Sequence, residues 1–188
     1  MTIVPDAKDW TWVITAACPE CGFDANRHDP EGTAALVRAH VEIWNGVLCG
    51  AMAEQHDPRV RDRVDVWSPL EYACHVRDVC RIYNERLLRM VHEENPLYQN
   101  WDQDATAVEA RYAAQDPVIV AEELSAAAYT LAGSFDTVAA QGPTVWARTG
   151  RRSDGAAFTI ATFSQYFTHD LVHHLWDIQA HTPPLNLR

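Results

Sequence analysis

Positive charge is scarce in this sequence. Its 188 residues include 15 Lys or Arg against 26 Asp or Glu, a formal net charge of −11 at pH 7. Nucleic acids and anionic membranes are bound through basic patches, so this balance argues against both as partners. Lys8 is the one lysine, beside fourteen arginines. Together with the abundant alanine, this bias indicates a source with GC-rich codons.

The sequence also lacks long apolar runs. No apolar stretch approaches the roughly 18 residues that a membrane-spanning helix needs, and the charged N-terminus has no apolar signal-peptide core. The five cysteines are an odd number, and Cys49, Cys74 and Cys80 fall within helical patterns. Such usage is typical of reduced thiols. We therefore expect a cytoplasmic protein.

Size and composition favour one folded domain. The chain is long enough for one buried core but too short for two ordinary domains with separate functions. With 47% apolar and 10% aromatic residues, it is not a disordered chain. We assign residues 29–182 to a helical domain and residues 1–28 to an irregular N-terminal extension. The aromatic content is compatible with a homodimer, although no heptad or symmetric patch marks an interface.

Signals for helix starts divide the domain. Ser68 is followed by Pro69 and Glu71, which complete a capping box, and this helix should run to about residue 92. Similar signals predict helices over residues 29–55, 117–140 and 159–180, with a short strand at 144–148. Four amphipathic segments predict an all-α protein, an antiparallel four-helix bundle with a long loop between its second and third helices.

The last predicted helix carries the sequence HDLVHH at residues 169–174. His169 and His173 are four residues apart and therefore project from one face of the helix. Two such imidazoles can hold a divalent metal if a third ligand comes from elsewhere in the fold. His174 lies about 100° further round and is expected to face away. With nine histidines in the chain, a purely structural pair is the alternative.

His75 is the candidate for the third ligand, because it lies on the otherwise apolar stripe of the second predicted helix. Metal sites in helical bundles are built from such inward-facing residues, so His75, His169 and His173 should meet. Asp78 and Asp177 share helix faces with His75 and His173, and each can accept a hydrogen bond that orients an imidazole. The alternative is that both acids pair with arginines at the surface. No residue is assigned a catalytic role, and Cys74 points away from His75.

The extension contains the sequence CPECG at residues 18–22. It resembles one knuckle of a zinc ribbon, in which Cys18 and Cys21 would bind one metal. A complete ribbon needs a second pair, which the sequence lacks, and His28 is the other candidate ligand. The segment is thus a second metal site, a reduced surface turn or a redox-sensitive thiol pair.

The loop over residues 95–115 is long for a compact domain, and such loops often cover functional sites. Its aromatic residues Tyr98 and Trp101 lie among acidic residues. They are predicted to form a lid over a pocket, or else to anchor the loop to the core.

Three segments together resemble the DinB superfamily, of an actinobacterial type: residues 67–79 (WSPLEYACHVRDV), 100–104 (NWDQD) and 169–174 (HDLVHH). In that family a histidine on the second helix joins an HxxxH or ExxxH pair on the last helix around one metal. The resemblance spans residues 29–180 and implies His75, His169 and His173 as the ligands. Zinc or nickel would be the first candidates for the ion.

The same resemblance implies an activity. The superfamily includes mycothiol- and bacillithiol-dependent S-transferases and the mycothiol-dependent maleylpyruvate isomerase. It implies a metal-dependent thiol S-transferase or isomerase, with mycothiol as cosubstrate and a small electrophile as substrate. Two alternatives remain: a non-catalytic stress protein that binds metal or small molecules, and a metal-dependent hydrolase.

Overall fold

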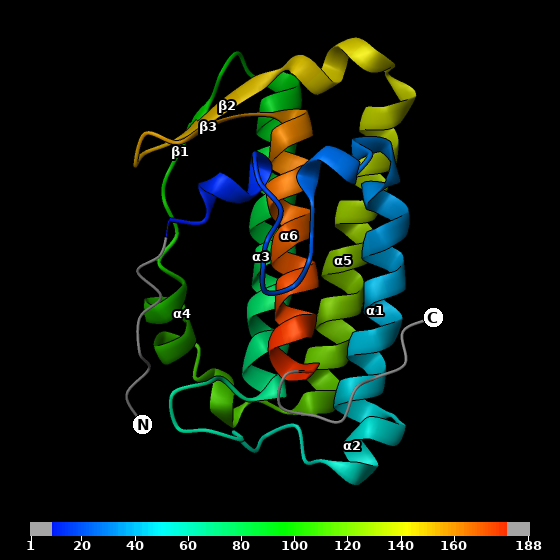
Figure 1. The fold of residues 1–188 in the computed structure, drawn as a ribbon, viewed down its shortest axis with the longest axis vertical. Coiled ribbons are helices and arrows are strands. Elements are labelled where there is room, and N and C mark those ends of the chain that lie inside the picture. Colours follow the sequence, from blue (N-terminus) through cyan, green and yellow to red (C-terminus); the bar gives the residue numbers. More distant parts are fainter. Residues whose placement is uncertain (1–8, 180–188) are drawn as a thin grey trace.

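The structure is a computed structural model that describes residues 9–179, and four long helices form its body (Figure 1). They are α1 (Thr33–Cys49), α3 (Pro69–His92), α5 (Pro117–Ala140) and α6 (Ile160–Gln179). Trp44, Phe135 and Phe167 are among the fully buried side chains where these helices meet. The all-α four-helix bundle predicted from the sequence is confirmed.

The direction of the helices explains the long loop. α1 and α6 run one way, and α3 and α5 run the other way (Figure 1). Because α3 and α5 point in the same direction, the chain must return along a 24-residue helix, about 36 Å, before α5 can begin. Residues 93–116 make this crossover, which contains β1 (Leu97–Tyr98) and α4 (Gln103–Glu109).

The start of α3 is fixed by the capping box that the sequence predicts. The Ser68 hydroxyl accepts a hydrogen bond from the Glu71 amide at 3.3 Å, and the Glu71 carboxylate accepts one from the Ser68 amide at 2.9 Å. Glu71 also pairs with Arg61, whose Nε is 2.7 Å from the carboxylate. Burial opposes ionisation of Glu71, but Arg61 and Ser68 outweigh it and lower the pKa of this carboxyl.

The first predicted helix is interrupted in the structure. Asp29 caps only the short 3-10 turn Pro30–Gly32, and α1 begins after it. At the other end, Gly50 separates α1 from the short helix α2 (Ala51–Gln55). A side chain at Gly50 would lie 2.9 Å from the Cα of Gly46, so the break depends on a close approach of two glycines.

The strand predicted at residues 144–148 is wrong, because Pro143–Ala147 is a 3-10 helix. The strands lie just after it, as a hairpin of β2 (Thr149–Arg152) and β3 (Ala157–Thr159), and β1 pairs in parallel with β2. Gly150 lets this sheet approach α3, since a Cβ there would lie 2.7 Å from Cγ of Met90. Thr159 then caps α6 by accepting a hydrogen bond from the Thr162 amide at 3.1 Å.

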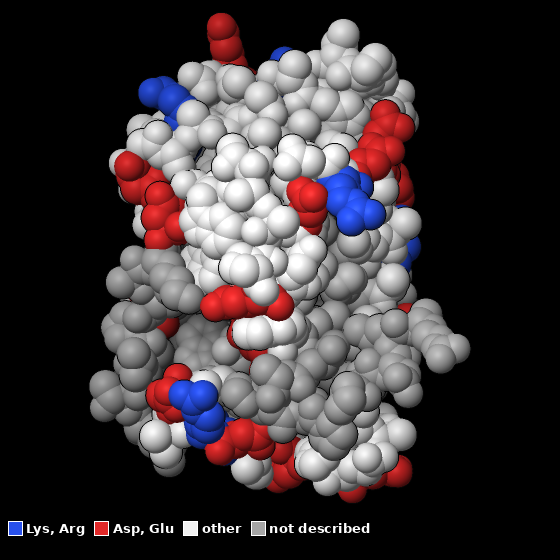
Figure 2. Space-filling model, viewed as in Figure 1, with Lys and Arg blue, Asp and Glu red and all other residues white. Residues whose placement is uncertain are grey.

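The N-terminal segment, residues 9–32, packs along α6 rather than standing apart (Figure 1). Val13 and Cys18 are buried, and the Gln165 side chain of α6 donates a hydrogen bond to the Ala25 carbonyl at 2.9 Å. Within residues 9–179, no helix combines the length and apolarity needed to cross a membrane. On the face drawn in Figure 2, acidic side chains are more frequent than basic ones.

Candidate functional site

Helix α6 presents an i,i+4 pair on each of two faces. Asp170 and His174 face α3, where they meet His75; we call these three residues the bundle centre. His169 and His173 face the N-terminal segment, where they meet Cys18 and Cys21; we call these four the knuckle cluster. Within each group, one potential ligand atom per residue lies within 4.8 Å of every other.

The structure therefore does not bring the predicted trio together as one ligand set. His75 belongs to the bundle centre, whereas His169 and His173 belong to the knuckle cluster. The expected outward direction of His174 is wrong, since its ring lies 4.7 Å from that of His75, edge to face at 88°. One residue along a helix is a turn of about 100°, and this step separates the two sets. The sequence signal that could have identified the bundle centre is the spacing of Asp170 and His174, which are also four residues apart.

The ligand atoms of the bundle centre are buried and poorly satisfied. The Nε2 atom of His75 is 3.6 Å from Oδ2 of Asp170, and Nε2 of His174 is 3.4 Å from Oδ1 of the same carboxylate. The side chain of His75 is 1% exposed. Both of its ring nitrogens, and Oδ2 of Asp170, are buried without a hydrogen-bond partner among the described residues. Each such atom costs about 1–3 kcal/mol, which coordination to a cation would offset. The three side chains therefore fit a divalent metal.

Protonation in the bundle centre follows from its buried charges. Burial opposes ionisation of Asp170, but the charged ring of His174 outweighs it and holds the pKa of this carboxyl far below its usual range. Burial alone would lower the pKa of His174, yet Asp170 and Asp177 raise it to about 10. Burial lowers the pKa of His75, which is therefore a neutral imidazole. Metal binding would displace the proton of His174, as metal sites generally require.

Asp177 orients a histidine, although not the one predicted from the sequence. Its Oδ2 lies 2.9 Å from Nδ1 of His174, so it accepts the hydrogen bond that directs Nε2 of that ring toward Asp170. Its Oδ1 is 3.9 Å from Nε2 of His173, too far for a hydrogen bond. A carboxylate behind an imidazole is the usual companion of a metal-bound histidine.

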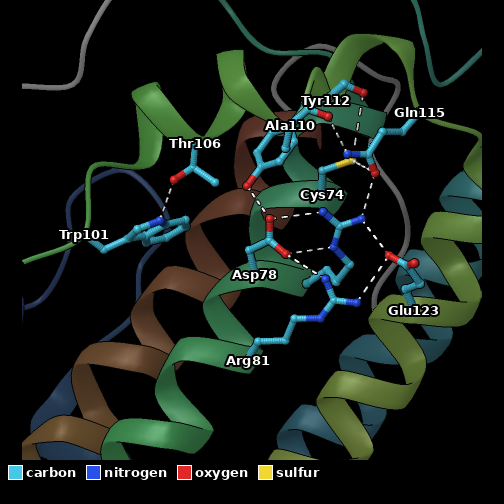
Figure 3. A network of polar contacts seen from close by, with 10 residues as sticks. Cys74, Asp78, Arg81, Trp101, Thr106, Ala110, Tyr112, Gln115 and Glu123 are labelled. Atoms are coloured by element: carbon cyan, nitrogen blue, oxygen red, sulfur yellow. Dashed lines mark hydrogen bonds and ion pairs between the residues drawn. The ribbon is translucent and has the colours of Figure 1, made fainter.

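Asp78 has other partners (Figure 3). It accepts hydrogen bonds from the Tyr112 hydroxyl at 2.6 Å, from Arg77 Nε at 2.9 Å and from Arg81 at 3.1 Å. Among the described residues it makes no hydrogen bond to His75. Burial opposes its ionisation, but Arg77 and Tyr112 outweigh it and lower the pKa of Asp78. The alternative weighed from the sequence, an acid paired with arginines, describes this residue.

Cys74 points into the same network, as Figure 3 shows. Its sulfur is 3.5 Å from the side-chain oxygen of Gln115. Burial raises the pKa of this thiol to about 12. A buried thiol that resists ionisation is a poor nucleophile, in agreement with the expectation that Cys74 points away from His75.

The two aromatic residues of the crossover have different positions. Trp101 stacks on His75, with ring centroids 5.3 Å apart and an angle of 11° between the planes. Its indole N–H donates a hydrogen bond to Thr106 at 2.7 Å (Figure 3). Tyr98 is instead buried in β1, with the Arg86 guanidinium 4.8 Å from its ring. Trp101 covers the ring of His75 in the bundle centre, whereas Tyr98 anchors the loop.

A cavity of about 620 Å³ borders both clusters. Trp67 and Tyr72 line it together with the α6 residues Asp170 and His174. Its volume is in the range of small-molecule sites. The bundle centre therefore has access to a space that can hold a substrate.

In the knuckle cluster, thiols and imidazoles lie close together and are largely buried. The sulfur of Cys18 is 3.8 Å from Nδ1 of His173. Burial, with Cys18 close by, raises the pKa of Cys21 to about 12, and burial with the nearby His173 lowers the pKa of His169 to about 4. His28, the additional ligand considered from the sequence, lies instead 2.9 Å from the Thr33 hydroxyl and 3.3 Å from that of Thr168.

Comparison with known proteins shows a likeness in structure. No family model and no curated protein matches the sequence. A solved structure does match: YfiT from Bacillus subtilis, described as a probable metal-dependent hydrolase with an unusual four-helix bundle topology. The match has a TM-score of 0.65 and 14% identity, and it covers 82% of this chain and 87% of YfiT. At this identity the likeness shows the fold, so the chain has a fold similar to that of YfiT.

Proposed function

We propose that the bundle centre binds one divalent metal ion and that the protein uses it to transfer a small thiol to an electrophilic substrate. The observation that carries the proposal is the set of buried, unpartnered ligand atoms of His75 and Asp170 beside a cavity of about 620 Å³. Three protein ligands are typical of catalytic sites, in contrast to the four of structural sites.

When bound, a divalent ion would supply a Lewis acid that favours the ionised form of a coordinated thiol or water. The protein's residues have supporting tasks. Asp177 fixes the ring of His174, and Trp101 covers the ring of His75 on one side. Asp170 contributes one negative charge, so this site is less positive than the three imidazoles expected from the sequence.

The thiol in this proposal comes from outside the protein. Cys74 faces Tyr112 and Gln115, and burial raises the pKa of Cys80 strongly. Cys18 and Cys21 lie at the other face of α6. The resemblance to the DinB superfamily favours mycothiol as the thiol, and the cavity is large enough for a ligand of drug-like size.

Hydrolysis is the second candidate, because YfiT is described as a probable metal-dependent hydrolase. It would need a general base close to the metal. The acids considered for this role are already engaged: Asp78 with arginines, Glu71 with Arg61 and Asp177 with His174. We therefore rank thiol transfer above hydrolysis.

The test is a coupling assay with zinc- or nickel-loaded protein, mycothiol and chlorodinitrobenzene. The thiol forms a carbon–sulfur bond and releases chloride and a proton. We expect conjugation that His75→Ala abolishes, whereas His92→Ala at the exposed end of the same helix does not. Ester or amide hydrolysis without thiol dependence would favour the second candidate. Absence of both reactions across several thiols and esters would contradict an enzymatic role.

A further inference from the structure

We propose that Cys18, Cys21, His169 and His173 form a second metal site, a tetrahedral zinc site that fastens the N-terminal segment to α6. This site is distinct from the bundle centre and does not depend on thiol transfer. Its two halves come from opposite ends of the sequence, a turn at residues 18–22 and one face of a helix.

A hydrogen-bonded turn at residues 18–22 holds the two cysteines close together. The Cys18 amide donates a hydrogen bond to the Phe23 carbonyl at 2.8 Å, and the Gly22 amide donates one to the Cys18 carbonyl at 2.9 Å. Gly22 has a φ of 75°, a left-handed conformation that glycine adopts without strain. The turn brings the sulfurs of Cys18 and Cys21 to the same side, facing α6.

The spacing of the ligand atoms is close to that of a zinc site. Zinc bound at about 2.3 Å from sulfur and about 2.0–2.1 Å from nitrogen in a tetrahedron would place S and N about 3.6 Å apart. The distance from Cys18 Sγ to His173 Nδ1 is 3.8 Å. The rings of His169 and His173 have centroids 4.9 Å apart on consecutive turns of α6. All four ligand atoms lie within 4.8 Å of one another, so one ion between them could reach every ligand.

The hydrogen bonding of the histidines leaves suitable atoms for a metal. Nε2 of His169 is buried without a hydrogen-bond partner among the described residues, and its side chain is 4% exposed. While Nδ1 of His173 faces Cys18, its Nε2 lies 3.4 Å from the Glu20 carboxylate. A carboxylate behind the second ring nitrogen is what metal-bound imidazoles commonly have.

The ligand set and its surroundings indicate a structural zinc ion. Two thiolates with two imidazoles suit zinc, and four protein ligands leave no position for substrate. The ring of Trp10 packs 4.8 Å from that of His173 and 5.3 Å from that of His169, so the indole packs against both imidazoles. Because His169 and His173 are the sequence neighbours of Asp170 and His174, an ion here would also hold the orientation of the bundle centre.

The test combines metal content with cobalt spectroscopy on the full-length protein, purified under reducing conditions. We expect two zinc ions per chain, one of which is lost in Cys18→Ser/Cys21→Ser and the other in His75→Ala/His174→Ala. The exposed Cys49→Ser is the matched control and should keep both. With cobalt, a sulfur-to-metal charge-transfer band should appear in the wild type and in His75→Ala/His174→Ala.

The cobalt measurement on the wild type tests whether Cys18 and Cys21 bind metal even if the cysteine variant fails to fold. Absence of the charge-transfer band, or a Cys18–Cys21 disulfide in the mass spectrum of the reduced preparation, would overturn the proposal. Zinc content unchanged in folded Cys18→Ser/Cys21→Ser would overturn it as well. Loss of the bundle-centre ion alone leaves the band in place, so the two metal sites are tested separately.

Discussion

His173 and His174 are consecutive residues of α6, yet their rings belong to different clusters. The ring centroids are 6.3 Å apart at an angle of 70°, with His173 beside Cys18 and His174 beside His75. One helix thus serves two candidate metal sites through residues one position apart.

Asp177→Asn should weaken metal binding at the bundle centre. The substitution keeps the size of the side chain but replaces the carboxylate that holds Nδ1 of His174. Loss of such a partner typically costs about 10- to 100-fold in metal affinity. Competition with a chelator would measure the change. Asp78→Asn is the control, since Asp78 binds arginines, and an equal loss of affinity in that variant would contradict the assignment.

Trp101→Ala should speed the release of metal from the bundle centre, because the indole covers one face of His75. Stopped-flow transfer of zinc to a chromogenic chelator should show a several-fold faster phase. Trp101→Phe should restore most of the wild-type rate, since a phenyl ring can still stack on the imidazole. Equal release rates in all three proteins would assign Trp101 a packing role only.

Glu71→Gln should lower the free energy of unfolding relative to the wild type, and this loss should be larger at neutral pH than at acid pH. The pKa of Glu71 is lowered in the folded state, so its charge stabilises the fold above the usual carboxyl range, and this contribution is lost as the pH falls through the folded-state pKa. At pH 7 the cost should be about 1–3 kcal/mol, because Arg61 loses its charged partner. Urea unfolding at pH 7 and at pH 3–4 would measure the difference, which should shrink at the lower pH.

The matched control for Glu71 is Glu93→Gln. Glu93 pairs with Arg89 at the surface, where solvent screens the charges, so little change in the free energy of unfolding is expected. A pH-independent cost for Glu71→Gln would show that the charge of its pair with Arg61 does not stabilise the fold.

Gly150→Ala should destabilise the hairpin against α3. The added methyl group would lie 2.7 Å from Cγ of Met90 and 3.1 Å from the Tyr98 ring, and such overpacking typically costs about 1–3 kcal/mol. Gly133→Ala is the control of opposite sign. It lies within α5, and apart from the backbone of that helix no atom of residues 9–179 lies within 4 Å of the new methyl group, so the substitution should stabilise the protein by about 0.5–1 kcal/mol. Thermal unfolding of both variants would test the pair.

The sequence predicts well what depends on neighbouring residues. The caps of Ser68 and Asp116 define the starts of α3 and α5, because a cap involves only the next three residues. The break at Gly50 and the hairpin at residues 149–159 depend on contacts with Gly46 and Met90, which local patterns do not show. The long crossover was visible as a loop, but its cause, the parallel course of α3 and α5, is a property of the whole bundle.

In the candidate site, too, local spacing is predictable from the sequence, whereas the contacts between helices are not. The spacing of His169 and His173 predicts that they share a face, and they do, but it does not reveal which neighbour that face meets. His75 was predicted to point inward, and it is buried at 1% exposure. The rotation of α6 about its axis decides whether His75 meets His173 or His174. This rotation is set by packing against α3 and the N-terminal segment.

The central claim is that the metal of the bundle centre is held by His75, Asp170 and His174. Anomalous diffraction at the zinc edge, from crystals of the zinc-loaded protein, tests it most directly. We expect a peak within coordination distance of those three side chains, and a second peak at the knuckle cluster. A single peak bound by His75, His169 and His173 would exclude Asp170 and His174 as ligands and restore the ligand set expected from the sequence.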